Sequence, residues 1–423
     1  MIQIIALVLL YLIFPLVIIF LCNKFSFFKK IGTIVLAYAF GLILGSSGLL
    51  PRGSDGYYEA QQGRAVIPAA EMQTLYEQGD ISNDDFMVNS IANAQDLLTS
   101  IVIPLAFPLL LFSLNVKRWM KYAKDGLISM ILALLSIIIV VASGYFMFSN
   151  KLPDSWKVAG MLVGLYTGGT PNLVSLKLAM DVDTDVFIMT NAYDMIVGAF
   201  VLIFFLTAGP KLFRKILPPF VYKGENVDVE AAVKEAESFD DFTGMFRKDR
   251  ILPLIKALGL SLVIFLIGFG LSLLLPNVSQ MVVVILTITT LAIFASFIPS
   301  VNKIEKSFQL GMYFILVFSF TVASMANIQS LLNASYLPLI LYITYAYFGA
   351  LFLHVILSKI FKVNADDFLI TTTTFLFSPP FVPVMAGALK NKEVILTGIT
   401  IGIIGYVIGN YLGVGLAFFL KGF

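Results

Sequence analysis

The sequence is poor in the residues that carry most enzymatic chemistry. It contains one cysteine, Cys22, and one histidine, His354, in 423 residues. A lone cysteine excludes a disulfide or a thiolate metal site within the chain. No segment resembles the G-x-x-x-x-G-K-[ST] phosphate-binding loop, and no catalytic triad or metal-ligand spacing occurs. We therefore expect neither an enzyme nor an ATP-driven pump, with no cofactor and no nucleic-acid partner.

Charge is also scarce, because 13% of the residues are charged and 59% are hydrophobic. Runs of about 20 apolar residues recur along the chain, as a bilayer-spanning helix requires. The first run has no basic leader and no small-residue cleavage site, so we interpret it as a membrane helix rather than a signal peptide. The composition predicts an all-α polytopic membrane protein. Ten strong apolar segments are expected at 2–22, 31–50, 97–114, 126–148, 186–209, 252–275, 279–300, 307–326, 336–358 and 394–420.

Two further apolar segments, 157–182 and 365–390, are interrupted at their centres. The first contains "YTGGTPN" and the second "SPPFVP", so each has a hydroxyl residue followed by proline. Serine and threonine cap helix N-termini, and proline is favoured at the first helical position. Each segment is therefore predicted to break and then to restart a helix near the middle of the membrane. The alternative is that proline merely kinks two ordinary spanning helices.

The distribution of lysine and arginine favours re-entrant hairpins over full crossings. If Met1 faces outward and both broken segments turn back, most basic residues fall inside, including those of "KRWMKYAK". Each half then has five crossings with a hairpin between the fourth and fifth, and both termini are extracytoplasmic. Because five is odd, the halves form a 5+5 inverted repeat. The first repeat is predicted over 1–209 and contains an extracytoplasmic insertion at 49–96. A cytoplasmic linker with a short helix over 228–237 is predicted at 210–250. The second repeat is predicted over 251–423.

The two breaks are predicted to meet near the membrane midplane. Restarted helices present free N–H groups and positive dipole ends, which together bind anions. Interrupted backbone is tolerated at this depth where it lines a cavity, and its carbonyl groups can coordinate Na⁺. The predicted substrate-binding residues are Gly168, Gly169, Thr170, Pro171, Asn172, Thr374, Ser378, Pro379 and Pro380.

Asp194 is the most prominent acidic residue within an apolar segment. An intramembrane carboxylate is a functional candidate by default, although an interfacial, solvated position is the alternative. We predict that it binds the coupling ion, with help from Asn191, Tyr193 and Asn410, and that Na⁺ could bind at Asn172 and Asp194.

Three further polar residues have two interpretations each. Lys177 is a possible charge partner of Asp194, or its side chain could extend to the surface. Asn410 could instead hydrogen-bond between helices. His354 is expected to be a neutral histidine hydrogen-bonded between helices rather than a proton relay.

The "YTGGTPN" and "SPPFVP" motifs resemble those of the YjcL-like family of bacterial membrane proteins. That family is similar to the cation-antiporter and anion-transporter superfamily, and its architecture resembles that of the glutamate–sodium and citrate–sodium symporters. The resemblance implies hairpin tips at Gly168–Asn172 and Ser378–Pro380, and it adds cell-wall peptides to the possible substrates. The second tip lacks the Gly-Gly pair of those symporters, which leaves the substrate open.

The sequence therefore predicts a secondary active transporter of the bacterial inner membrane that works by an elevator mechanism. We expect Na⁺- or H⁺-coupled uptake of a small organic anion, such as a carboxylate, an acidic amino acid or a short peptide, by a homodimer. The alternative function is a monovalent cation/proton antiporter with Asp194 as the carrier.

Overall fold

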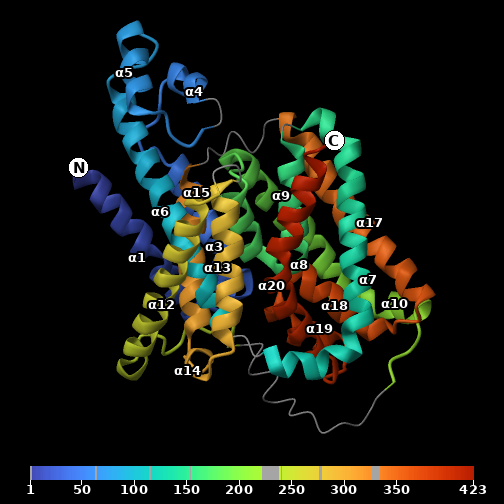
Figure 1. Cartoon of the computed structure of the whole chain (residues 1–423). Helices are drawn as coiled ribbons and strands as arrows, with labels where there is room; N and C mark the ends of the chain where they lie inside the picture. The colour runs from blue at the N-terminus through green and yellow to red at the C-terminus, as the bar shows by residue number, and fades with distance from the viewer. Residues whose placement is uncertain are drawn as a thin grey trace. The chain divides into compact units, whose positions relative to one another are not determined.

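The fold is entirely helical in the part of the chain that the structure describes, which confirms the predicted all-α class (Figure 1). The computed structural model contains eighteen α-helices and three short 3-10 helices there. The helix predicted over 228–237 lies outside the described residues. The structure describes residues 2–61, 64–113, 116–152, 154–221, 238–239, 241–275, 279–325 and 334–423.

Eight described helices are long and apolar enough to cross a membrane. Two shorter apolar helices complete the ten predicted segments, so the chain is a polytopic membrane protein. The eight long helices are α1 (Ile2–Lys24), α6 (Asp84–Phe112), α7 (Val116–Phe148), α9 (Thr184–Thr207), α12 (Lys248–Leu273), α15 (Ser307–Met325), α17 (Leu337–Ile360) and α20 (Val394–Leu420), and the shorter ones are α3 (Thr33–Ser46) and α13 (Gln280–Ser296).

Several short helices connect these segments. The helices α4 and α5 lie in the insertion at 49–96, and they enclose a small apolar core around Tyr57, Ile67, Met72 and Ile81. The short connecting helices are α2 (Ser26–Ile31), α4 (Asp55–Gln61), α5 (Ala69–Gln78), η1 (Ser149–Lys151), α10 (Gly209–Ile216), α14 (Pro299–Asn302) and η2 (Ala334–Tyr336).

The chain forms two compact units, and each unit draws on both halves of the sequence. In the first unit, a buried hydrogen-bonded cluster joins α1, α6 and α15. The Tyr11 hydroxyl lies 2.7 Å from both Ser324 Oγ and Gln95 Nε2. The first unit comprises Met1–Ala106, Val182–Met189 and Gly311–Tyr336.

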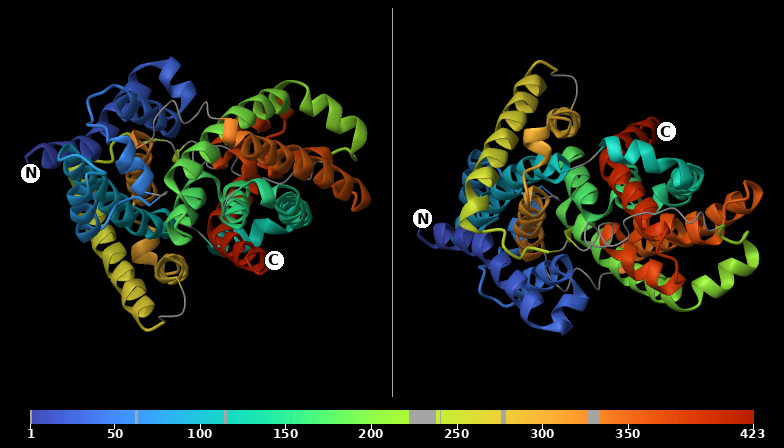
Figure 2. Two further views of the ribbon diagram at one scale, coloured as in Figure 1. Left: turned by 90° about the horizontal axis from the view of Figure 1, so that it is seen from above. Right: turned by 90° about the horizontal axis from the view of Figure 1, so that it is seen from below.

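The second unit contains both interrupted segments. Helix α20 packs along α8 (Ser155–Ala179) and also along α18 (Ala365–Phe377), while α7 packs against α17. Helices α12 and α13 lie side by side, as both views in Figure 2 show. The second unit comprises Phe107–Asp181, Thr190–Leu310 and Leu337–Phe423.

The first interrupted segment folds back on itself at Gly169. An unbroken helix of its length would extend about 37 Å, yet its two ends meet, because Lys157 Nζ donates a hydrogen bond to the Asp181 carbonyl at 2.9 Å. A Cβ atom placed on Gly164 would lie 2.1 Å from Leu176 Cδ1, so the two arms run in direct contact. The segment is a helical hairpin rather than a kinked rod.

The second interrupted segment also folds back. Helix α18 ends at Ser378, and the chain restarts through η3 (Pro379–Phe381) into α19 (Val382–Leu389). Its ends meet as well, since Asn391 Nδ2 donates to Asp366 Oδ2 at 2.9 Å. Arg214 donates to both Asp366 carboxylate oxygens at 2.9 Å and to the Leu389 carbonyl at 2.8 Å, which links the two ends of the hairpin.

A row of glycines on α20 allows both hairpins to approach the same helix closely. A Cβ atom at Gly405 would lie 1.8 Å from the Thr167 carbonyl oxygen of the first hairpin. A Cβ atom at Gly402 would lie 2.6 Å from Pro379 Cγ of the second. Close backbone approach at small residues is the usual basis of helix packing in membranes. Gly398, Gly409 and Gly413 make the same kind of contact.

Candidate functional site

The tips of the two hairpins meet. A Cβ atom placed on Gly169 would lie 2.2 Å from Ser378 Oγ, so the Ser378 side chain fills the space that Gly169 leaves open. Both breaks have nearly the same backbone conformation, with φ 67° and ψ −165° at Gly169 and φ 75° and ψ 165° at Ser378. The structure therefore matches Gly169 to Ser378, one residue away from the Thr170–Ser378 match that the hydroxyl–proline pairs predicted.

The second tip differs from the predicted N-terminal cap. Ser378 makes no side-chain cap hydrogen bond. Pro379 and Pro380 have no N–H groups, and the Phe381 N–H is already bonded to the Ser378 carbonyl at 3.2 Å. The start of this helix therefore presents fewer free N–H groups for an anion than the sequence predicted. The hydroxyl residues Thr170 and Ser378 are both half-buried at the tips.

Asn172 fixes the first tip against α20. Its side chain is fully buried, and Nδ2 donates to the Gly405 carbonyl at 3.2 Å. Its Oδ1 atom has no hydrogen-bond partner among the described residues. Gly168 is required beside it, because a Cβ atom there would lie 2.0 Å from Asn172 Nδ2. Pro171 is buried next to it.

Two threonines before the second break bond within their helix, whereas the buried hydroxyls of Thr371 and Thr373 have no hydrogen-bond partner among the described residues. Thr374 Oγ1 donates to the Ile370 carbonyl at 2.7 Å, and Thr372 Oγ1 makes the same kind of bond to Phe368. His354 Nδ1 lies 3.0 Å from Thr372 Oγ1, so the predicted hydrogen bond of His354 between helices is confirmed.

Asp194 lies in a cluster that sequence reasoning did not identify. Its carboxylate is 9% exposed and lies beside the hydroxyls of Tyr166 from α8 and Tyr347 from α17. The two tyrosine rings pack edge to face at 4.8 Å. One turn further along α9, a Cβ atom at Gly198 would lie 2.8 Å from Tyr347 Oη and 3.5 Å from Phe377, the residue before the second break.

The other residues predicted for the coupling-ion site have separate surroundings. Asn191 is buried and donates to Met195 Sδ at 3.3 Å, while Tyr193 is half-buried. Lys177 is 7% exposed and so does not extend to the surface. Within the described part of the chain, the side chains that act on Asp194 are the two tyrosines.

Asn410 connects three helices. Its Oδ1 accepts a hydrogen bond from Ser175 of α8 at 2.5 Å, and its Nδ2 donates to Thr289 of α13 at 3.3 Å. Both ends of the amide are therefore used, as in the interhelical interpretation of this residue.

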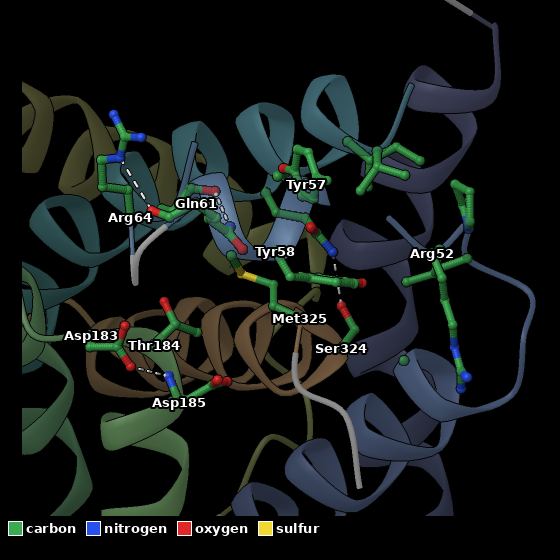
Figure 3. A pocket seen from close by; sticks show the side chains of 18 residues that line it. Arg52, Tyr57, Tyr58, Gln61, Arg64, Asp183, Thr184, Asp185, Ser324 and Met325 are labelled. Atoms are coloured by element: carbon green, nitrogen blue, oxygen red, sulfur yellow. Dashed lines mark hydrogen bonds between the residues drawn. The ribbon is translucent and has the colours of Figure 1, made fainter. Parts of the chain in front are cut away.

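A separate pocket of about 450 Å³ lies in the first unit (Figure 3). It contains none of the predicted site residues. Arg64 is paired with Glu71 through hydrogen bonds of 2.7 and 2.8 Å, and burial raises the pKa of Tyr57 to about 12. Its labelled lining residues are Arg52, Tyr57, Tyr58, Gln61, Arg64, Asp183, Thr184, Asp185, Ser324 and Met325.

Among the described residues, no group of three or more histidine, cysteine, aspartate or glutamate side chains is placed to hold a metal ion. Sodium binding at Asn172 and Asp194 stays a prediction.

The fold and its centre define a class: a polytopic helical membrane protein with two hairpins whose breaks meet. The chain matches the family described as "Protein of unknown function (DUF819)" over residues 57–423, and it belongs to that family. It is also 25% identical over 329 residues to the "Uncharacterized membrane protein YjcL" of Bacillus subtilis (strain 168), a match that covers 75% of this chain and 81% of the relative. The predicted membership of a YjcL-like family is confirmed.

Proposed function

We propose that this protein is a secondary active transporter. The observation that carries the proposal is the contact between two helical hairpins at their breaks, Gly169 and Ser378. Breaking a helix in a membrane leaves backbone groups unpaired at a cost of several kcal/mol each, and such breaks occur where they are buried in protein or line a cavity. Paired breaks of this kind form solute sites in transporters built from inverted repeats.

The proposed cargo is a small organic anion, such as a carboxylate, an acidic amino acid or a short peptide. The half-buried hydroxyls of Thr170 and Ser378 are available at the tips to donate to a carboxylate. The dipole of the restarted first helix adds a positive field. Because the second tip has few free N–H groups, the first hairpin and the two hydroxyls would provide most of the contacts to the anion.

The proposed mechanism is elevator-like. The two hairpins and α20 would move together as the core, because the glycine row packs both hairpins against this one helix. The protein would form a homodimer in the bacterial inner membrane, with both termini outside. The first helices of each half would form the scaffold.

The second candidate function is a monovalent cation/proton antiporter. The specific observation that favours it is Asp194, a buried carboxylate in a membrane helix. In that case the tips would not recognise an organic solute.

Thermal melting of the purified protein separates the two functions. We would compare Na⁺ and K⁺ buffers across a panel of organic acids, amino acids and muropeptide fragments. A ligand at 100 times its Kd stabilises the folded state by about 2.7 kcal/mol. Stabilisation by one anion supports the transporter of organic anions, and uptake of that anion into proteoliposomes tests it directly. Stabilisation by cations or pH alone, with every organic solute inactive, favours the antiporter.

A further inference from the structure

We infer that Asp194, Tyr166 and Tyr347 together form the binding site for the coupling cation. The inference deepens the proposed function, because the cation would be the one that drives transport. Tyr166 and Tyr347 are new to the site, whereas Asn191 and Asn410 make other contacts. The three residues come from α8, α9 and α17, all within the second unit.

The buried carboxylate of Asp194 is incompletely hydrogen-bonded. The Asp194 side chain is nine-tenths buried, and its Oδ1 has no hydrogen-bond partner among the described residues. The Tyr166 hydroxyl is fully buried beside Asp194, and it makes no hydrogen bond of normal geometry among the described residues either. A buried carboxylate is unfavourable unless a proton, a cation or hydrogen bonds neutralise it. A small positive ion at Oδ1 satisfies both atoms, because a hydroxyl oxygen can accept as well as donate.

The cluster also lies between the two hairpins. Tyr166 lies three residues before the first break at Gly169. On the other side, α9 contacts Phe377, which immediately precedes the second break, through Gly198. A cation at Asp194 therefore touches the arm of one hairpin and lies one helical turn from the end of the other. Its binding would fix the relative position of the two arms, as coupling of ion and solute requires.

The site would bind one ion with a single positive charge, which is either H⁺ or Na⁺. Among the described residues, the titratable groups that act on Asp194 are Tyr166 from α8 and Tyr347 from α17, while α18 contributes the uncharged Phe377 near Gly198. A melting experiment with one arm for each ion distinguishes them.

The test measures the melting temperature of the purified full-length protein without organic solute. One arm varies Na⁺ against choline at constant pH, and the other varies pH at constant choline. The variants are Asp194→Asn, Tyr166→Phe and Tyr347→Phe. Tyr342→Phe is the matched control, because this buried hydroxyl on α17 donates to the Val141 carbonyl at 2.7 Å and not to Asp194.

We expect one arm to shift the melting temperature of the wild type, and the shift to vanish in Asp194→Asn. Tyr166→Phe and Tyr347→Phe should weaken the apparent affinity about tenfold, as loss of a supporting ligand does, while Tyr342→Phe keeps the wild-type affinity. A Na⁺ shift at constant pH identifies sodium, and a pH shift independent of salt identifies the proton.

The inference is overturned if the wild type responds in neither arm, if Asp194→Asn responds as the wild type does, or if both tyrosine variants keep full affinity. Failure of the proposed function gives a different result. In that case the cation response persists and depends on Asp194, but no organic solute stabilises the protein or enters proteoliposomes.

Discussion

Ser378 holds a backbone conformation that is almost exclusive to glycine, and its counterpart in the first hairpin is a glycine. Its φ of 75° and ψ of 165° fall in a region that costs about 1–3 kcal/mol for other residues. A serine kept at this cost, with its hydroxyl at the contact between two hairpins, indicates that the hydroxyl has a function.

The first prediction concerns this serine. Ser378→Gly should stabilise the protein by about 1 kcal/mol, because relief of strain exceeds the added freedom of the unfolded chain, and it should reduce transport by removing the hydroxyl. Ser378→Ala is the matched control, since it keeps the strain and loses only the hydroxyl. Thermal melting and uptake assays check both. A Ser378→Gly protein that transports at the wild-type rate would remove this hydroxyl from the solute site.

At the residue scale, the sequence located the two breaks to within one residue. The hydroxyl–proline pairs suggested that Thr170 matches Ser378, but the chain bends at Gly169. No sequence pattern marks a serine that adopts a positive φ. The correct match between the two breaks could therefore not be predicted from the sequence. Tyr166 and Tyr347 were missed for another reason: they are far apart in the sequence, and only the fold brings their hydroxyls to Asp194.

At the element scale, α20 determines how closely the hairpins pack. Five of its glycines are explained by atoms of the two hairpins that lie against them rather than by turns. Gly415, on the same helix, has open space around it. The two kinds of position look alike in the sequence, because an apolar helix rich in glycine does not reveal which glycines face a neighbour.

The second prediction compares these positions. Gly405→Ala should destabilise the protein by about 1–3 kcal/mol, because its Cβ would overlap the Thr167 carbonyl oxygen. Gly415→Ala should be neutral or stabilising by up to about 1 kcal/mol, since alanine is the better helix former. Melting temperatures of the two variants in the same detergent make the comparison. Equal effects at both positions would contradict the close approach of the first hairpin to α20.

The third prediction concerns the base of the second hairpin. Arg214→Gln leaves the Asp366 carboxylate, which is 1% exposed, without its cation. Removing one partner from a buried pair is costly, but the Arg214 side chain is 42% exposed, so solvent reduces the loss. We expect about 2 kcal/mol of destabilisation. Lys211→Gln, an exposed lysine on the same helix, is the control and should change little. Restored stability in the double variant Arg214→Gln, Asp366→Asn would identify the buried charge as the cause.

At the scale of the whole molecule, the apolar segments were predictable because their length follows from membrane thickness. All ten are helices in the structure. The start of α6 at Asp84 was not predicted, since its first turns are polar and belong to the insertion rather than to the apolar run. The hairpin form of the two interrupted segments was favoured by charge distribution, and the contacts between their ends now confirm the fold-back.

The last prediction concerns membrane topology. A hairpin that enters and leaves by one face must expose both of its ends on that face, whereas a spanning helix exposes them on opposite faces. In a Cys22→Ser background, Lys157→Cys and Asp181→Cys should both react with an impermeant thiol reagent from outside the cell. Lys362→Cys and Lys392→Cys flank the second hairpin at exposed positions, and both should react only after the membrane is opened. If the two members of either pair label from different faces, that segment crosses the membrane, and the inverted repeat of five crossings per half cannot hold.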